Sequence, residues 1–286
     1  MLINLKWWRW VLLIIAGEIL IIIGRGLMPE QEKINKPVPS RTEEVYGEFV
    51  TWKEVNRLFP QYANAVITDC DTKMKFKVQR RAGSLHADVQ PLTAADTAIM
   101  KKIYQGGWSW KRRAVIVEVK DGRKLAGSMH GMPHGQGAIQ GNNFNGHFCI
   151  HFRDSKVHAS RRVDPAHQMM VWKAAGVFGE QVGRMNQEDV IRVFFTAIEQ
   201  DDFGLAARMI IPTGSAARAL ESFKNLESVR VESIALVAKN TDNTYRVKLL
   251  TVTKGSKRSA RQQFLINVHG AGEGSLYNFR PVQSPN

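Results

Sequence analysis

Residues 146–152 read GHFCIHF, and this stretch shows most clearly how the chain around it folds. Polar and apolar residues alternate along it, which is typical of a β-strand with one buried face, because successive side chains of a strand point to opposite sides of the sheet. Two histidines and a cysteine share one face, namely His147, Cys149 and His151. The other face carries large apolar residues, namely Phe148, Ile150 and Phe152. We therefore expect the apolar face to lie in a core and the face with Cys149 to line a cleft.

More short strands are predicted on both sides of this stretch, within a β-rich domain that we place at residues 49–178. Residues 73–79 alternate polar with apolar residues, as a half-buried strand does. Residues 114–119 read AVIVEV, which is typical of a more deeply buried strand. Residues 127–146 are rich in glycine, histidine and asparagine and predict a loop held between strands.

Two helices of the same domain are predicted from the residues at their ends. Thr93 can cap a helix, and Asp96 stands three residues later, where it can complete a capping box. Asp164 begins the second helix, with Pro165 in its first turn and Gly176 after its end.

A second, smaller domain is predicted over residues 184–286. Asn186 begins an amphipathic helix whose apolar residues recur every three to four positions. Strand-like runs follow at 228–238, 244–253, 258–268 and 275–282. A helix followed by an antiparallel meander resembles, in pattern only, the cone-shaped folds of the nuclear transport factor type. We expect a curved antiparallel sheet in a domain that binds a partner, acts as a spacer or gives structural support.

The N-terminal segment predicts a membrane anchor. Residues 1–27 hold an apolar run from Trp10 to Gly24, and Lys6 and Arg9 precede it. Positive charge before such a run places the N-terminus in the cytoplasm and the later domains outside, as a single-pass protein of the cell membrane. A cleaved signal peptide is the alternative, although no small-x-small cleavage site follows. Residues 28–48 are rich in proline and charge and predict a stalk.

These segments together give the predicted fold class. It is α+β, with a transmembrane helix, a β-rich domain that resembles a catalytic domain, and a small α+β domain.

The formal net charge of the chain is +14, from 40 Lys and Arg against 26 Asp and Glu. Such an excess predicts attraction to anionic partners, namely a membrane surface, peptidoglycan or another anionic wall polymer. The sequence holds no Gly-rich phosphate loop, no aromatic RNA-binding signature and no zinc-finger spacing, so nucleic acid is not the expected partner. Cys70 and Cys149 are too few for a disulfide framework.

Six of the eight histidines lie between His130 and His167, in the part of the chain that also holds Cys149. A cysteine nucleophile needs a nearby base or positive charge to form its thiolate. The run SMHGMPHG offers His130 and His134 as bases, and the glycine after each lets the backbone approach a substrate closely.

This pattern resembles the L,D-transpeptidases, which cross-link peptidoglycan stem peptides through a cysteine acyl-enzyme. The family carries His-Gly, a spacer, then Ser or Thr, His, Gly, Cys, an apolar residue and Arg. His130 and Gly131 match its first half, and the stretch from Gly146 to His151 is similar to its second half. His130 lies 19 residues before Cys149 and His134 lies 15 before it, which favours His130 as the base and His134 as the second choice.

Three positions depart from the family pattern. Gly146 replaces the hydroxyl residue, Phe148 replaces a glycine that helps to form the oxyanion hole, and His151 replaces the arginine that receives a substrate carboxylate. The carboxylate would then be bound by His151 as a cation or by Arg153. The resemblance implies a catalytic set of Cys149, His130, His134 and His147. It implies a substrate-binding set of His151, Arg153 and Gly131, with neither metal nor cofactor.

Two other functions fit the same residues. A zinc hydrolase of cell-wall peptides would use histidines four residues apart, as His130 and His134 are, together with Cys149 or with His86 and Asp88 of the run SLHADVQP. A non-catalytic wall-binding or scaffold protein would use none of this chemistry.

Overall fold

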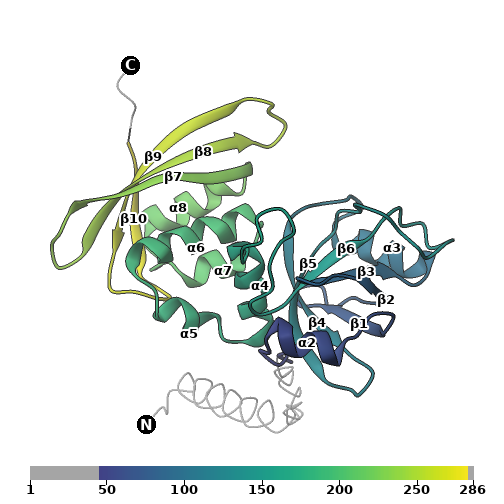
Figure 1. Ribbon diagram of the computed structural model, residues 1–286. Helices are drawn as coiled ribbons and strands as arrows, with labels where there is room; N and C mark the ends of the chain where they lie inside the picture. Colours follow the sequence, from purple (N-terminus) through teal and green to yellow (C-terminus); the bar gives the residue numbers. More distant parts are fainter. Residues whose placement is uncertain (1–44, 283–286) are drawn as a thin grey trace, which may run out of the picture. The chain divides into compact units, whose positions relative to one another are not determined.

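Six antiparallel strands close into a barrel in the first half of the chain, in a computed structural model that describes residues 45–282 (Figure 1). The strands are β1 (Asn64–Asp69), β2 (Lys75–Ala82), β3 (Ala87–Pro91), β4 (Arg112–Glu118), β5 (Lys124–His130) and β6 (Phe148–His151). Their order around the barrel is β1-β2-β3-β6-β5-β4. The barrel closes because β1 pairs with β2 on one side and with β4 on the other.

The barrel is filled by the apolar residues of its strands, which alternate with outward-facing residues as strand geometry requires. The buried cluster includes Val78, Val89, Val115, Leu125 and Phe148. Two helices, α2 (Trp52–Leu58) and α3 (Ala94–Ile103), add side chains to the same cluster. The predicted start of α3 is confirmed, because Thr93 and Asp96 form a capping box.

Helix α4 (Pro165–Ala175) lies on the outer face of β4 and β5. Its predicted ends are confirmed, since Asp164 accepts hydrogen bonds from the first turn and Gly176 closes the helix with φ of 72°. The other side of α4 packs against α6 (Gln187–Glu199), so one buried cluster joins the barrel surface to the second half of the chain.

The second half has a four-stranded antiparallel sheet, whose predicted meander is confirmed by the strand order β10-β9-β8-β7. The strands are β7 (Leu226–Ala238), β8 (Asn243–Thr253), β9 (Ser259–Val268) and β10 (Leu276–Pro281). Helices α6 and α8 (Gly214–Phe223) pack against its edge strands β7 and β10. Two short helices, α5 (Phe178–Gly183) and α7 (Phe203–Arg208), complete this half. The predicted domain boundary between residues 178 and 184 falls on α5.

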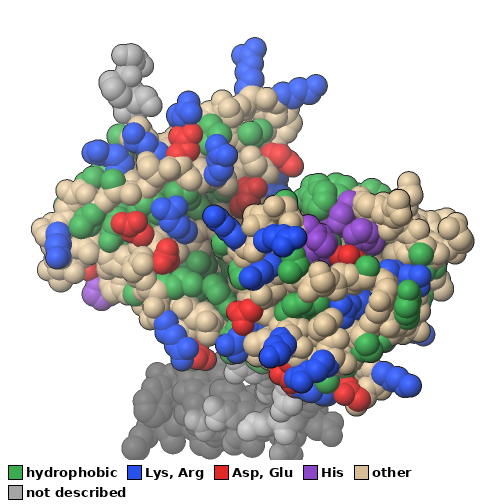
Figure 2. All heavy atoms as spheres, in the orientation of Figure 1, with side chains coloured by type: hydrophobic (Ala, Val, Ile, Leu, Met, Phe, Trp, Pro, Cys, Tyr) green, Lys and Arg blue, Asp and Glu red, His purple; other side chains and the backbone are tan. Residues whose placement is uncertain are grey.

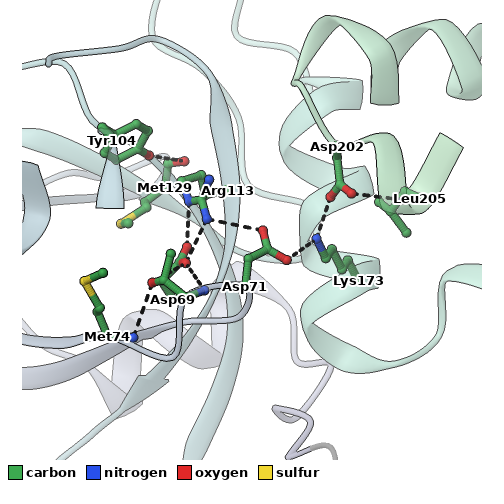
Figure 3. Close-up of polar contacts among 10 residues, drawn as sticks. Asp69, Asp71, Met74, Tyr104, Arg113, Met129, Lys173, Asp202 and Leu205 are labelled. Carbon is green, nitrogen blue, oxygen red and sulfur yellow. Dashed lines mark hydrogen bonds and ion pairs between the residues drawn. The ribbon is translucent and has the colours of Figure 1, made fainter. Parts of the chain in front are cut away.

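A charged network fastens the barrel to the helices (Figure 3). Arg113 donates from Nε and Nη2 to the two carboxylate oxygens of Asp69, at 2.7 and 2.8 Å. Lys173 on α4 donates to Asp71 and to Asp202, each at 2.6 Å. Asp202 is also the N-cap of α7, so the network runs from the β1–β2 turn through α4 to α7.

The predicted fold class is wrong in its transmembrane helix, and it did not specify how the strands of the β-rich part are arranged. The β-rich part is a closed barrel, because β1 and β4 pair across more than forty residues of sequence, and a strand's own pattern does not reveal its partner. No helix among residues 45–282 is long and apolar enough to cross a membrane. The anchor predicted for residues 1–27, and the stalk up to residue 44, lie outside the described residues. The predicted single-pass location rested on that anchor and is not retained.

Candidate active site

Strand β6 places Cys149 on the outside of the barrel. Phe148 and Ile150 lie in the barrel core, as the alternation predicts, and Cys149 points the other way with only 4% of its surface exposed. The predicted division of this strand into an apolar face and a face with histidine and cysteine is confirmed, but Cys149 and His151 are buried and do not line an open cleft.

The neighbours of β6 bring more polar side chains to the same outer face. β6 lies between β3 and β5, and Asp88 of β3 is the direct cross-strand partner of Cys149. The histidines around these two residues come from two strands, three loops and α4, and they are His86, His130, His134, His147, His151, His158 and His167. Figure 2 shows a group of histidine side chains at the surface of the molecule in this region.

His134 is the histidine that contacts the thiol. Its Nε2 lies 3.4 Å from Cys149 Sγ, and its Nδ1 lies 3.1 Å from the carbonyl oxygen of Met132. Because a carbonyl oxygen only accepts, Nδ1 carries the proton in a neutral ring, and the lone pair of Nε2 faces the thiol. The arrangement is a thiol, a base, and a backbone group that orients the base.

The backbone explains why His134 rather than His130 reaches the thiol. His134 and His147 exchange two N–H to O=C hydrogen bonds of 2.9 Å each, which lays the loop beside the start of β6. Gly146 allows this approach, because its φ is +116° and a Cβ there would lie 2.5 Å from the carbonyl oxygen of His134. His130 ends β5 instead, with its ring 4.7 Å from that of Trp110. The geometry thus reverses the order of bases that the spacing predicts.

Burial disfavours the charged form of four histidines of this site, His130, His134, His151 and His167. It lowers the pKa of His130 to about 3 and also lowers the pKa of His134. The pKa values of His151 and His167 lie well below the ordinary value for the same reason, which disfavours a cationic His151 as the group that binds a carboxylate.

The thiol is neutral as well. Burial raises the pKa of Cys149, and the negative charge of Asp88, whose Oδ1 lies 3.8 Å from Sγ, raises it further. The expected help of neighbouring histidines in forming a thiolate therefore does not produce a resting thiolate at Cys149. The resting pair is a neutral thiol beside a neutral imidazole.

The remaining predicted residues divide into two groups. His147 stays near the site, with Nε2 4.0 Å from Asp88 Oδ1, and His151 stacks on His167 at 3.8 Å. Arg153 lies over the ring of Phe49 at 4.8 Å.

Gly131 packs against the ring of Tyr104, where a Cβ would approach the ring carbons to 2.5 Å. The structure gives Gly131 a packing role, and neither Gly131 nor Arg153 lies against Cys149.

Asp88 and His86 are central to the site but stand outside the predicted catalytic set. The sequence did contain an indication of their role. His86 and Asp88 are two residues apart in a strand-like run, so both side chains point to the same face of the sheet. His158 joins them from the loop after β6, with Nε2 3.6 Å from Asp88 Oδ1. No sequence pattern links this loop to β3.

A hollow of about 580 Å³ lies over the charged network of Figure 3. Its cations are already paired with carboxylates, Arg113 with Asp69 and Lys173 with Asp202 among them. The face around Cys149 is therefore the better candidate for chemistry.

Comparisons of the chain with protein-family models, with curated proteins and with solved structures find no match. The resemblance to the L,D-transpeptidases rests on the motif residues alone and stays a prediction.

Proposed function

We propose that this protein is a cysteine acyltransferase or hydrolase in which Cys149 is the nucleophile and His134 the general base. The observation that carries the proposal is the distance of 3.4 Å between Cys149 Sγ and His134 Nε2, with Nδ1 of the same ring held by the Met132 carbonyl. A nucleophile within reach of a base that a third group orients is the arrangement on which acyl transfer depends.

The neutral thiol sets the order of events. Sγ attacks the carbonyl carbon of an amide as its proton moves to His134 Nε2, so the proton leaves sulfur while the C–S bond forms. The tetrahedral intermediate then collapses, the C–N bond breaks, and His134 returns the proton to the departing amine. An amine or water next attacks the thioester, with His134 taking its proton, and Cys149 leaves with the proton restored.

Stem peptides of peptidoglycan are the substrate class that we favour. The support is the motif shared with the L,D-transpeptidases and the net charge of +14, which suits an anionic wall polymer. Trp110, 51% exposed, stands beside the base with its ring 5.4 Å from that of His134. An aromatic surface in this place suits the apolar part of a bound peptide or sugar.

The test is formation of an acyl-enzyme by the full chain. A synthetic stem tetrapeptide and an activated thioester of the same acyl group are incubated with the protein in the presence of a chelator, and intact mass and peptide mapping locate the adduct. We expect one acyl group on Cys149. His134→Gln should slow its formation by at least about a hundredfold, since general-base catalysis contributes on the order of 10²–10⁴.

Two matched variants complete this experiment. Cys70→Ser should form the adduct at the normal rate, and His130→Gln should slow it much less than His134→Gln does. Acylation that persists in Cys149→Ala, or that His134→Gln leaves unchanged, would contradict the proposal. Acylation that occurs only when the chelator is left out would point to metal chemistry instead.

A further inference from the structure

We propose that His86, Asp88 and His158 form a binding site for a divalent transition metal ion, with Zn²⁺ the ion that they suit best. The site lies beside the pair formed by Cys149 and His134 and does not depend on acyl transfer. Two imidazole nitrogens and one carboxylate oxygen are a ligand set that zinc accepts, with a fourth position left for water.

The spacing of the ligand atoms fits a tetrahedral ion. His86 Nε2 lies 3.2 Å from Asp88 Oδ1, and His158 Nε2 lies 3.6 Å from the same oxygen. Ligands at the usual Zn–N and Zn–O distances of about 2.0–2.2 Å stand roughly 3.3–3.6 Å apart in a tetrahedron. All three ligand atoms lie within 4.8 Å of one another, so closing the set around an ion needs only a small rotation of the exposed His158.

His86 supplies an independent indication of a ligand. The residue is 1% exposed, and its buried Nε2 lies 3.2 Å from Asp88 Oδ1 without meeting the geometry of a hydrogen bond. Buried polar atoms of this kind are nearly always satisfied, so this one calls for a partner.

The contact of His86 Nδ1 determines what kind of partner His86 Nε2 requires. His86 Nδ1 lies 2.7 Å from the carbonyl oxygen of Lys156, which only accepts, so Nδ1 carries the proton of a neutral ring. The lone pair of Nε2 then faces the carboxylate oxygen of Asp88 at 3.2 Å. Two electron-rich atoms at this distance repel each other unless a cation lies between them. A metal-binding histidine is commonly held in this way, with its second nitrogen donating to a carbonyl.

The surroundings let an ion enter and limit where it binds. The side chain of His158 is 55% exposed, whereas that of Asp88 is 10% exposed, so the site opens toward solvent on the side of His158. Cys149 Sγ and His147 Nε2 stand farther from Asp88 Oδ1, at 3.8 and 4.0 Å. The geometry therefore assigns the ion to the two nearer nitrogens rather than to the thiol.

The experiment measures metal binding by the full chain without an affinity tag. Zinc binding is followed by titration calorimetry and by metal analysis after gel filtration, and Co²⁺ serves as a spectroscopic replacement. We expect one Zn²⁺ per chain and a Co²⁺ spectrum with d–d bands of a four-coordinate ion and no thiolate-to-metal charge transfer. His158→Gln changes an exposed residue and should weaken zinc binding by at least about tenfold. Removing a residue that only hydrogen-bonds a metal ligand already weakens binding by about 10–100-fold.

Three further variants give the experiment its controls. Asp88→Asn should weaken binding as much as His158→Gln. His269→Gln removes another histidine that is paired with an aspartate, His269 Nδ1 lying 2.6 Å from Asp242, and it should change nothing. Cys149→Ala should keep the zinc although it has no nucleophile to acylate, so the metal site and the proposed reaction succeed or fail separately.

Two results would overturn the site. No stoichiometric Zn²⁺ or Co²⁺ binding would mean that a proton, rather than a metal ion, lies between His86 and Asp88. A thiolate charge-transfer band that Cys149→Ala abolishes would place the metal on the thiol and its neighbours His130 and His134 instead.

Discussion

Gly146 shows how a single residue selects the base of the candidate site. Its backbone has φ of +116°, and the carbonyl of His134 lies where a side chain would begin. A glycine is required at this position because the loop segment that carries His134 passes over it. The same contact sets His134 beside Cys149.

Gly146→Ala should destabilise the protein and move His134 away from the thiol. The left-handed backbone and the Cβ contact of 2.5 Å together should lower the free energy of unfolding by about 2–3 kcal/mol. Gly122→Ala is the matched control, since Gly122 also has positive φ, +84°, but open space around it. Urea unfolding of the two variants separates the contact from the backbone strain. Equal losses in both would contradict the close approach.

Cys70 should be a slow thiol despite being only partly buried. Burial raises its pKa to about 12, and the charges of Asp69 and Asp71 add to the effect. A thiol with a raised pKa stays protonated until the pH approaches that value, and only the thiolate is alkylated. Alkylation of Cys70 at pH 8 should therefore be at least about a hundredfold slower than that of a free thiol with pKa ~8.5. Iodoacetamide labelling followed by peptide mapping measures the rate in the folded and the urea-unfolded chain. Rapid labelling of Cys70 in the folded chain would show that its environment is more open.

At the scale of elements, the pair of Asp69 and Arg113 holds the end of β1 against the start of β4, the two strands that close the barrel. Asp69 is fully buried, and Thr72 donates to it as well. Burial alone would raise the pKa of Asp69, but Arg113 and Thr72 outweigh it and leave the pKa below its usual range.

Arg113→Ala should lower the free energy of unfolding by about 3 kcal/mol, because it leaves a buried carboxylate without its charge partner. Arg184→Ala is the control on an exposed pair, Arg184 with Glu180, and should change stability by no more than about 0.5 kcal/mol. Chemical unfolding at neutral pH measures both. Equal, small effects would mean that water replaces Arg113 at Asp69.

Because the pKa of Asp69 is lowered in the folded state, we expect the free energy of unfolding to depend on pH. A carboxyl group with a depressed pKa in the folded state stabilises the fold above its unfolded pKa of ~3.9, and that contribution is lost as the pH falls through the folded value. Unfolding free energy should therefore decrease below pH ~4 in the wild type and decrease less steeply in Asp69→Asn. Unfolding curves recorded between neutral pH and pH 2 compare the two slopes. Parallel slopes would show that Asp69 titrates alike in both states.

At the scale of the whole molecule, α4 is shared by the barrel and the second half of the chain. Met170 and Val171 of this helix lie in one buried cluster with Ile116 of the barrel surface and Ile191 of α6. Residues from Val45 onward accordingly form a single compact unit, although two separate buried clusters fill it.

Met170→Ala should destabilise both halves together. Removing a fully buried methionine side chain lowers the free energy of unfolding by about 2–5 kcal/mol. Because α4 serves both halves, circular dichroism and tryptophan fluorescence should report the same shifted transition. Val163→Ala, at an exposed position just before α4, is the control and should have little effect. Two transitions, of which only one moves, would show that the halves unfold independently.

The sequence by itself determined the parts of this protein that depend on neighbouring residues. Helix caps at Thr93, Asp164 and Asn186 and the alternation around Cys149 are set by contacts within a few residues, so pattern and spacing were enough to predict them. The same alternation also gave the face of the strand on which Cys149 and His151 lie.

Only the tertiary structure decided which segments meet. Barrel closure, the pairing of Asp88 with Cys149 and the approach of His158 join positions that are far apart in the chain, and strand periodicity carries no information about partners. The choice of His134 over His130 came from one backbone bridge, and the neutral state of thiol and imidazole came from burial. Both follow from what surrounds a residue in space, because solvation and close contact depend on the folded neighbours and not on the sequence next to it.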